Sequence, residues 1–455
     1  MAGQAFYRSP SRGSRRRTGR PFRVYTLASI REHPRWAEIP PTHRDALDIV
    51  GRVLPFRVND YVIDELIDWS AVPDDPMFQL TFPQPGMLSP ADYSRVGSTL
   101  KRSGPGAELD RLAREIRLGL NPNPAGQMEL NVPIIEGEPV SGIQHKYDET
   151  VLFFPAAGQT CHAYCTFCFR WPQFVGMPEY RFAGRESDSL VAYLRENPWV
   201  SDILITGGDP MVMPARVLRR YLEPMIAPGL ESVTSIRIGT RALTYRPARF
   251  VTDDDAYDVL RLFERIVAGG RNLAIMAHLN HDVELSTPLV RKAIRRLRST
   301  GATIRTQSPL VRHINDDPEV WRRLWAQSIR LGMVPYYMFV ERDTGARGYF
   351  AVPLVRAWEI YRAAASRVSG LARTVRGPSM STMAGKIEVL GPVTRNGERT
   401  LLLRFLQGRN PDWTYRPFHA RYSETATWID ELEPAPGDER FFFADELERM
   451  ERAGD

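Results

Sequence analysis

The chain has 455 residues, a formal net charge of +6 and a pI near 9.2. This length exceeds that of one ordinary domain but suits an α/β barrel with flanking segments. No stretch approaches the roughly 18 consecutive apolar residues of a membrane span. The first residues, MAGQAFYRSPSRGSRRRTGR, also lack the apolar middle of a secretory signal. We therefore expect a cytoplasmic protein without membrane contact.

The first 21 residues predict a disordered basic tail, because Pro, Gly and Arg dominate them. The opposite end, from Asp430 to Asp455, is acidic. A short basic tail is more often a solvated segment than a specific binding arm. Nucleic acid is therefore not the expected partner.

Residues 22–143 predict a helical cap and a wrapping segment. They carry the helical patterns HRDALDIVGRVL and ELDRLAREIRLGL, which the Pro-rich stretch PDDPMFQLTFPQPGML interrupts. Such a region lacks the alternation of strands and helices that follows it.

From Thr150 onward, short apolar runs alternate with amphipathic helical patterns. The six runs are TVLFF, SDILIT, TSIRIG, NLAIMA, ATIRTQ and VPYYMF. Continuous apolar strands joined by helices favour a parallel sheet, with polar residues following each strand as in α/β barrels. We predict an α/β fold in which residues 144–395 form an incomplete (β/α)6 parallel barrel and residues 396–455 a short C-terminal extension.

The three cysteines of the chain, Cys161, Cys165 and Cys168, lie in the segment GQTCHAYCTFCFRWP with the spacing C-x3-C-x2-C. An odd, clustered set argues for metal binding or catalysis over a disulfide framework. Three thiolates on one loop can bind three irons of a [4Fe–4S] cluster and leave the fourth iron open. Two alternatives remain. The cysteines can lie on one face of a buried helix, although the preceding residues AAGQT disfavour a helix here. They can also bind zinc with His162 as the fourth ligand.

A second motif, TGGDP, spans Thr206 to Pro210 directly after the second predicted strand. Its glycines, Gly207 and Gly208, allow close approach of the backbone to a ligand, and Asp209 offers polar contacts. The alternative is an ordinary strand-to-helix turn.

These motifs resemble the radical S-adenosylmethionine (SAM) superfamily. Residues Gln144 to Lys386 resemble in particular the lysine 2,3-aminomutase family, whose members combine SAM, a [4Fe–4S] cluster and pyridoxal phosphate (PLP). The segments that carry the resemblance occur in this order: QHKYDETV, CHAYCTFCFR, ILITGGDP, IRIGTRALTYRP, AHLNH, TQSPLVRHIND and PYYMFVERD.

The resemblance implies roles for individual residues. Arg170 matches the arginine that holds the substrate carboxylate, and Asp343 matches one of two aspartates that bind the side-chain ammonium of lysine. Tyr147 matches the tyrosine beside the PLP ring. The glycine-rich motif matches the part that holds the SAM amino group, and the remaining SAM candidates are His278, Gln307 and Arg241, the last also a phosphate candidate. Each of these residues has an alternative interpretation. Arg170 can be a surface arginine, Asp343 can cap a helix, and Tyr147 can be a core aromatic residue. His278 and Gln307 can be polar residues at the mouth of the barrel that are hydrogen-bonded within the protein.

PLP needs a lysine, and the chain has only Lys101, Lys146, Lys292 and Lys386 beside 56 arginines. The resemblance implies that Lys386, in the segment GPSMSTMAGKIEVLG, occupies the position of the family's PLP-binding lysine. It also implies that Lys146 occupies the position of a phosphate-binding arginine of the family.

Several positions depart from the family pattern. Thr150 occupies the position of a second phosphate-binding arginine of the family. The second substrate-binding aspartate has no clear counterpart, because the corresponding stretch here is TVRGPS, which contains Arg376. The family's C-terminal zinc-binding cysteines are absent, so a homo-oligomer would need another interface.

The function that the resemblance implies is a PLP-assisted 2,3-amino shift of an amino acid to a β-amino acid. Reductive cleavage of SAM gives a 5′-deoxyadenosyl radical that abstracts a hydrogen, which requires an electron donor such as flavodoxin or ferredoxin. One alternative is a PLP-independent radical SAM enzyme that performs another isomerisation or modification. The other is a non-enzymatic iron–sulfur protein.

Overall fold

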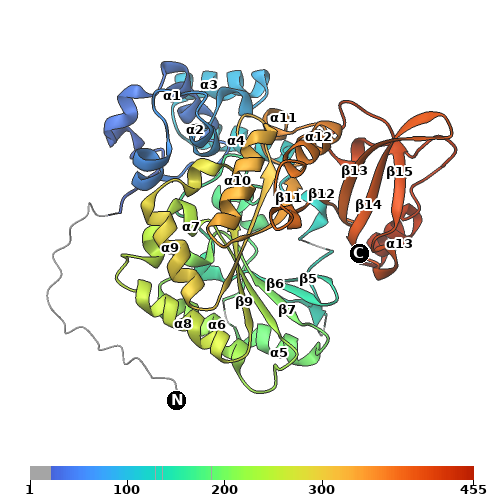
Figure 1. The fold of residues 1–455 in the computed structure, drawn as a ribbon. Coiled ribbons are helices and arrows are strands. Elements are labelled where there is room, and N and C mark those ends of the chain that lie inside the picture. Colours follow the sequence, from blue (N-terminus) through green and yellow to red (C-terminus); the bar gives the residue numbers. More distant parts are fainter. Residues whose placement is uncertain (1–21, 129, 136, 186, 455) are drawn as a thin grey trace, which may run out of the picture.

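The computed structural model describes residues 22–454 except 129, 136 and 186 (Figure 1). The predicted basic tail of residues 1–21 lies outside the described residues. Within the described part, no helix is long and apolar enough to cross a membrane.

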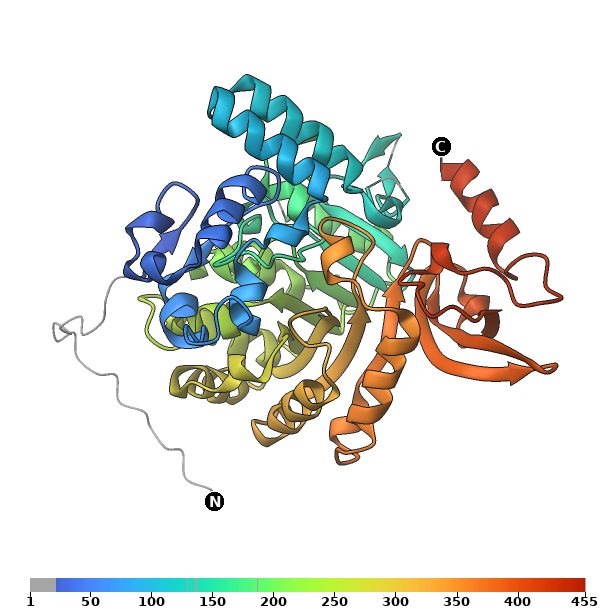
Figure 2. The same cartoon turned by 90° about the horizontal axis from the view of Figure 1, so that it is seen from above.

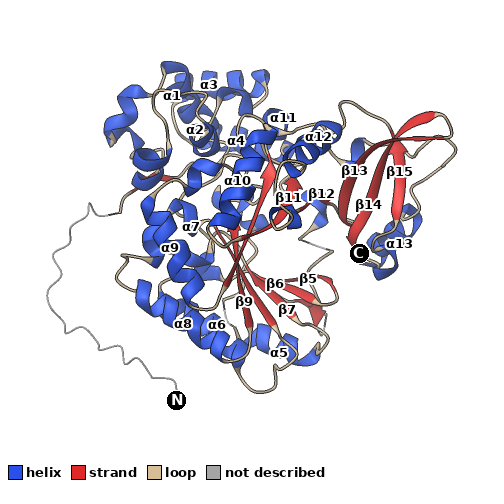
Figure 3. Cartoon of the chain, viewed as in Figure 1, coloured by secondary structure: helices blue, strands red, loops and turns tan. Residues whose placement is uncertain are grey.

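One large mixed sheet organises this part of the chain (Figure 3). It has eleven strands in the order β15-β14-β13-β12-β11-β10-β9-β8-β7-β6-β5. Strands β6 to β12 are parallel, and the pairings at both ends of the sheet are antiparallel. The strands are β5 (Ile143–Tyr147), β6 (Thr150–Phe153), β7 (Asp202–Ile205), β8 (Ser235–Thr240), β9 (Asn272–His278), β10 (Thr303–Leu310), β11 (Val334–Val340), β12 (Arg376–Ser381), β13 (Gly385–Arg395), β14 (Glu398–Gly408) and β15 (Pro417–Arg421).

The six predicted apolar runs are strands β6 to β11, so the α/β class and the parallel order of these strands are confirmed. The sequence did not predict the next parallel strand, β12. Closure of the six strands into an incomplete barrel stays a prediction.

Helices connect the parallel strands and cover the outside of the sheet (Figure 2). In α9, Val290, Ala293, Ile294 and Leu297 are buried, which is the i, i+3, i+4, i+7 stripe of an amphipathic helix. Thr287 caps this helix by accepting a hydrogen bond from the N–H of Val290. The helices of this part are α5 (Asp188–Glu196), α6 (Ala215–Leu222), α7 (Ala242–Tyr245), α8 (Ala256–Ala268), α9 (Pro288–Ser299), α10 (Pro318–Arg330), α11 (Arg347–Phe350) and α12 (Leu354–Ala365).

The N-terminal cap is helical, as predicted, and it contains one short sheet of β1 (Val24–Tyr25) with β2 (Val58–Asn59). Its helices are α1 (Pro41–Val50), α2 (Pro76–Thr81), α3 (Pro90–Ser103) and α4 (Ala107–Gly119). Helix α2 forms inside the Pro-rich stretch that we expected to interrupt the helices. Asp75 makes this possible, because its carboxylate accepts hydrogen bonds from the N–H groups of Met77 and Phe78 at the start of the helix.

The core of the cap continues into the carboxyl ends of the parallel strands. Buried cap residues such as Val62 and Phe78 share one hydrophobic cluster with Ala163, Tyr245 and Val311, which follow strands β6, β8 and β10. The cap therefore covers the edge of the sheet at which α/β proteins carry their chemistry.

The C-terminal strands form a separate hydrophobic core with α12 and α13 (Ala444–Gly454), to one side of the parallel strands (Figure 2). The predicted boundary between residues 395 and 396 falls in the turn between β13 and β14. Lys386 thus lies on the first strand of this antiparallel part. A shorter pair, β3 (Ile134–Ile135) with β4 (Glu138–Pro139), belongs to the wrapping segment. The proposed domain limits stay predictions.

Candidate active site

The three cysteines lie on an irregular loop between β6 and α5. All three are free and half-buried, and the loop contains turns but no helix from Cys161 to Arg170. The alternative of one buried helical face is therefore wrong. Burial raises the pKa of each thiol, for Cys168 to about 12. Thiolates at these positions need a compensating cation, which the irons of a cluster provide.

A single-metal site finds no support in the described residues. Among them, no three or more His, Cys, Asp or Glu side chains converge on one point as ligands of a metal ion. Thiolates that bind different irons of one cluster need not converge in this way. The expected fourth zinc ligand, His162, is buried in edge contact with Phe22. The donor set of three free thiols on one loop fits the [4Fe–4S] cluster.

The cap clamps this loop through its backbone. The N–H of Tyr164 donates to the carbonyl of Arg57 (2.8 Å), and the N–H of Thr166 donates to that of Leu80 (3.0 Å). Asn59, which is fully buried, donates from Nδ2 to the carbonyls of His162 (3.2 Å) and Tyr245 (3.0 Å). The cysteine loop is therefore positioned jointly by the sheet and the cap.

The TGGDP motif packs directly on the cysteine loop. A Cβ on Gly208 would lie 2.5 Å from the backbone N and O of Thr160, and one on Gly207 would lie 2.2 Å from Nε2 of Gln159. The N–H of Asp209 completes the contact by donating to the carbonyl of Thr160 (2.7 Å). Glycine is therefore needed for the approach of two protein loops, in addition to any role beside SAM.

The carboxylate of Asp209 holds the start of the turn after β8. It accepts hydrogen bonds from Thr240 Oγ1 (2.6 Å) and from the N–H groups of Met211 and Arg241 (2.9 Å each). Both oxygens are thus used within the protein. Direct contact of Asp209 with SAM stays a prediction.

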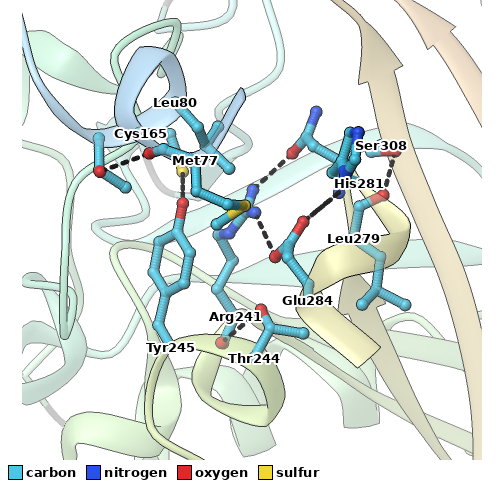
Figure 4. Close-up of polar contacts among 12 residues, drawn as sticks. Met77, Leu80, Cys165, Arg241, Thr244, Tyr245, Leu279, His281, Glu284 and Ser308 are labelled. Carbon is cyan, nitrogen blue, oxygen red and sulfur yellow. Dashed lines mark hydrogen bonds and ion pairs between the residues drawn. The ribbon is translucent and has the colours of Figure 1, made fainter. Parts of the chain in front are cut away.

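Arg241 anchors a buried network at the end of β8 (Figure 4). Its guanidinium donates to Asn280 Oδ1 (2.6 Å) and Glu284 Oε2 (2.8 Å), and it lies 4.3 Å from the ring centroid of Tyr245. The hydroxyl of Tyr245 lies 3.6 Å from Sγ of Cys165. Arg241 is therefore next to the cysteine loop, as expected, with its charge balanced by a fully buried glutamate.

His278 and Gln307 meet at the carboxyl ends of β9 and β10. Their Nε2 atoms lie 3.2 Å apart, so the imidazole nitrogen accepts a hydrogen bond from the amide. Burial lowers the pKa of His278 to about 3, helped by Arg241 and Arg170. With Nε2 as the acceptor, Nδ1 of the neutral imidazole carries the proton and can donate a hydrogen bond to a bound cofactor. The structure brings this predicted pair together.

Arg170 points its guanidinium at two aromatic rings, at 4.3 Å from the centroid of Phe154 and 4.9 Å from that of Phe169. Arg342 lies 4.9 Å from the centroid of the same Phe169 ring. Within the described part of the chain, the charged groups that act on Arg170 are cysteines and Arg342 and include no carboxylate, and burial lowers its pKa to about 10. A partly buried guanidinium without an anion is suited to a substrate carboxylate. The alternative of an ordinary surface arginine is wrong, since the side chain is half-buried.

Lys386 and Lys146 lie near Tyr147. The Nζ of Lys386 is 5.6 Å from the centroid of the Tyr147 ring and 5.0 Å from that of Tyr337, and the Nζ of Lys146 is 5.5 Å from the Tyr147 ring. The other two lysines, Lys101 and Lys292, are exposed on α3 and α9. The structure therefore agrees with Lys386 and Lys146 as the two candidates for a cofactor site.

Desolvation lowers the pKa of Lys386 to about 8, with help from Arg237 and Arg376, while Asp202 opposes the shift. The pKa of Lys146 also lies well below its usual value, because of burial and the charges of Arg409 and Arg342. Lys146 is held by a hydrogen bond to the carbonyl of Thr382. These amines lie in a cationic environment that suits a phosphate.

Thr150 and Asp343 have partners of their own. Thr150 donates to Asp202 Oδ2 (3.1 Å), so it does not replace the missing arginine as a phosphate ligand. Asp343 accepts a hydrogen bond from Asn121 Nδ2 (3.0 Å) at Oδ2, while its Oδ1 is buried without a partner. This free oxygen is an acceptor that a substrate ammonium can satisfy.

Sequence reasoning missed four members of the site: Asn59, Tyr245, Arg342 and Arg409. Arg409 was hidden among 56 arginines, Arg342 lay inside the quoted segment PYYMFVERD without being singled out, and Asn59 acts from the cap across more than 100 residues. Tyr245 lay inside a quoted segment, IRIGTRALTYRP, but a tyrosine after a strand is more often a core residue.

The comparisons with known proteins give relatives by sequence. No protein-family model matches the chain. The chain is 28% identical over 394 residues to a putative L-lysine 2,3-aminomutase of Aquifex aeolicus, covering 87% of this chain and 92% of that protein. It is 28% identical over 247 residues to the L-lysine 2,3-aminomutase of Bacillus subtilis, covering 54% and 49%.

Among solved structures, SuiB of Streptococcus suis bound to S-adenosylmethionine shares 12% identity over 60% of this chain and 56% of its own, with a TM-score of 0.32. A likeness at this score supports no conclusion. In sequence the chain is therefore similar to lysine 2,3-aminomutases, and in the Aquifex protein the similarity covers nearly the whole length.

Proposed function

We propose that the chain binds a [4Fe–4S] cluster on Cys161, Cys165 and Cys168 with SAM at the open iron, and acts on an amino acid held by PLP at Lys386. The reaction we favour is a 2,3-amino shift that gives a β-amino acid. When bound, the cluster with SAM supplies a radical able to abstract hydrogen, and PLP supplies a carbonyl that holds the amino group of the substrate.

One observation carries the proposal. The ring of Phe169, next to the third cysteine, is in contact with both Arg170 on the cysteine loop and Arg342, whose charge acts on the amine of Lys146. These contacts support our proposal that the cysteine loop and the lysine pair form one site, although Lys386 is 218 residues beyond Cys168 in the sequence.

The residues of the chain have separable tasks in this site. Lys386 offers an amine with lowered proton affinity, and Lys146, Arg342 and Arg409 offer positive charge for a phosphate. Arg170 holds the substrate carboxylate in a fixed orientation. The cap, through Asn59 and its neighbours, keeps bulk water from the cysteine loop.

Anaerobic reconstitution with iron, sulfide, SAM and PLP tests the proposal. Borohydride trapping and peptide mass spectrometry should find the pyridoxyl group on Lys386, and Lys386→Ala should lose it while SAM cleavage to 5′-deoxyadenosine survives. Lys292→Ala, at an exposed lysine of α9, is the matched control and should keep the label.

Other outcomes separate the rival functions. A label on Lys146 would reassign the PLP lysine. No label on any lysine with PLP in excess would favour the PLP-independent radical SAM enzyme. Absence of SAM cleavage with reduced flavodoxin, ferredoxin or dithionite would leave a non-enzymatic iron–sulfur protein.

A further inference from the structure

Tyr245 lies next to the cysteine loop without a role in the reaction described so far. It ends helix α7, directly after β8, and its side chain is completely buried. Its Oη lies 3.6 Å from Sγ of Cys165 (Figure 4). Its backbone carbonyl accepts a hydrogen bond from Asn59 of the cap, which fixes the backbone at this position.

The direction of this hydrogen bond follows from the chemistry of the site. In the free protein either the thiol or the phenol can be the donor. A cysteine that binds iron is a thiolate and has no proton, so the phenol of Tyr245 must then donate to the sulfur. A distance of 3.6 Å suits an O–H···S contact, because sulfur has a larger radius than oxygen, and the charge of the acceptor strengthens it.

Arg241 adds to the polarity of the phenol. Its guanidinium carbon lies 4.3 Å from the centroid of the Tyr245 ring, and Asn280 and Glu284 fix its orientation. A cation over the face of an aromatic ring withdraws electron density from the ring, which makes the hydroxyl a better donor. This stack is buried, so water does not screen it.

We propose that Tyr245 is a positioning residue that donates a hydrogen bond to the Cys165 thiolate and thereby raises the reduction potential of the [4Fe–4S] cluster, with Arg241 reinforcing the donor. The inference rests on the proposed function, because it requires the cluster. Reduction adds negative charge to the cluster and its thiolates, so a hydrogen-bond donor to sulfur stabilises the reduced state more than the oxidised state. Tyr245 therefore makes the cluster easier to reduce.

The test compares Tyr245→Phe with the wild type in the cluster-loaded, full-length protein. The midpoint potential is measured by anaerobic titration followed by electron paramagnetic resonance. We expect the equilibrium constant for reduction to fall by up to about tenfold, which is about 59 mV for a one-electron couple. Tyr361→Phe is the matched control, because its half-buried hydroxyl donates to a carbonyl, that of Val375 (2.9 Å), and not to a cysteine sulfur. An unchanged potential in Tyr245→Phe, at iron content equal to the wild type, overturns the inference.

A second variant covers the case in which Tyr245→Phe does not load iron. Site-specific 3-fluorotyrosine at position 245 keeps the shape of the side chain but is a stronger donor, so the potential should shift upward. No shift, or a downward shift, contradicts the inference. The proposed function fails separately, when the wild type itself binds no cluster or does not cleave SAM.

Discussion

The amine of Lys386 should be unusually reactive near neutral pH. Burial and the charges of Arg237 and Arg376 lower its pKa from 10.5 to about 8. At pH 7, about one Lys386 side chain in ten is then neutral, which is about 300 times the fraction for an ordinary lysine. Only the neutral amine attacks a carbonyl, so this difference acts directly on the attachment of PLP.

Competitive labelling measures this reactivity. Trace acetic anhydride is added at a series of pH values, and the acetylated fraction of each lysine is read by peptide mass spectrometry. The labelling of Lys386 should follow a single titration with a midpoint near 8. Lys292, exposed on α9, corrects for reagent decay in the same digest.

Two variants should move the midpoint in opposite directions. Arg376→Gln removes a repelling cation and should raise the pKa of Lys386, whereas Asp202→Asn removes an attracting carboxylate and should lower it. Asp202→Asn also leaves Arg237, its ion-pair partner, uncompensated, which acts in the same direction. A midpoint near the ordinary lysine value in the wild type, or the same shift in both variants, would refute the reasoning.

The same pKa predicts an effect on stability. A tenfold change in proton affinity is worth about 1.4 kcal/mol, so holding charged Lys386 in the folded state costs about 3 kcal/mol below the folded-state pKa. The cost declines as the pH rises from about 8 to 10.5, where the amine is neutral in both states. Lys386→Met should therefore be more stable to urea than the wild type at about pH 7, and its advantage should shrink toward pH 10 or so.

Three further predictions concern the cysteine loop and the substrate. Replacing any one of its three cysteines with Ala should abolish both iron binding and 5′-deoxyadenosine formation, measured by iron analysis and chromatography; SAM cleavage by the triple variant would contradict the assignment. Arg170→Lys keeps the charge but loses the two-pronged hydrogen bonding of the guanidinium. The free energy of substrate binding, measured by calorimetry, should therefore become less favourable by about 1.5–3 kcal/mol. Unchanged binding would show that Arg170 does not contact the substrate. Asn59→Leu removes two hydrogen bonds to buried carbonyls and should lower the free energy of unfolding of the iron-free protein by about 1–3 kcal/mol; a melting temperature equal to that of the wild type would show that the cap does not clamp the loop.

The sequence predicted those parts of the fold that local periodicity encodes. The six parallel strands follow from apolar runs, and α9 follows from a stripe of apolar residues with arginines on its other face. Helix α2 was not predicted because prolines usually interrupt helices. Pro76, however, occupies the first position of this helix, where proline is tolerated. Strand β12, with the sequence RGPSMS, was not predicted because it contains Gly and Pro and lacks an apolar run; its pairing with β11 on one side and β13 on the other makes it a strand.

The candidate site could be predicted only where residues match a motif or are rare. The cysteines met both conditions, and Lys386 was found because the chain has so few lysines. Arg409 had no such signal, and Arg342 was passed over although it lies inside PYYMFVERD, since the effect of both arginines on Lys146 arises only after the chain has folded. The role of Asn59 could not be predicted from the sequence either, because the two carbonyl groups that it contacts are 103 and 186 residues away.

Lys386 lies on a β-strand, which limits how the chain can vary around it. Side chains of a strand alternate between the two faces of the sheet, so a register slip of one residue would turn the amine to the opposite face. The pairing of Lys386 with Ser381 on β12 and Gln407 on β14 fixes the present register, and an irregularity follows directly at Ile387. An insertion between residues 382 and 384 would lengthen the turn between β12 and β13 and leave the pairing of the two strands unchanged. An insertion within β13 after Lys386 would shift the register of β13 against β14. Attempts to transplant or shorten the C-terminal strands should therefore keep β12, β13 and β14 as one piece, or the protein will fold with its reactive amine outside the site.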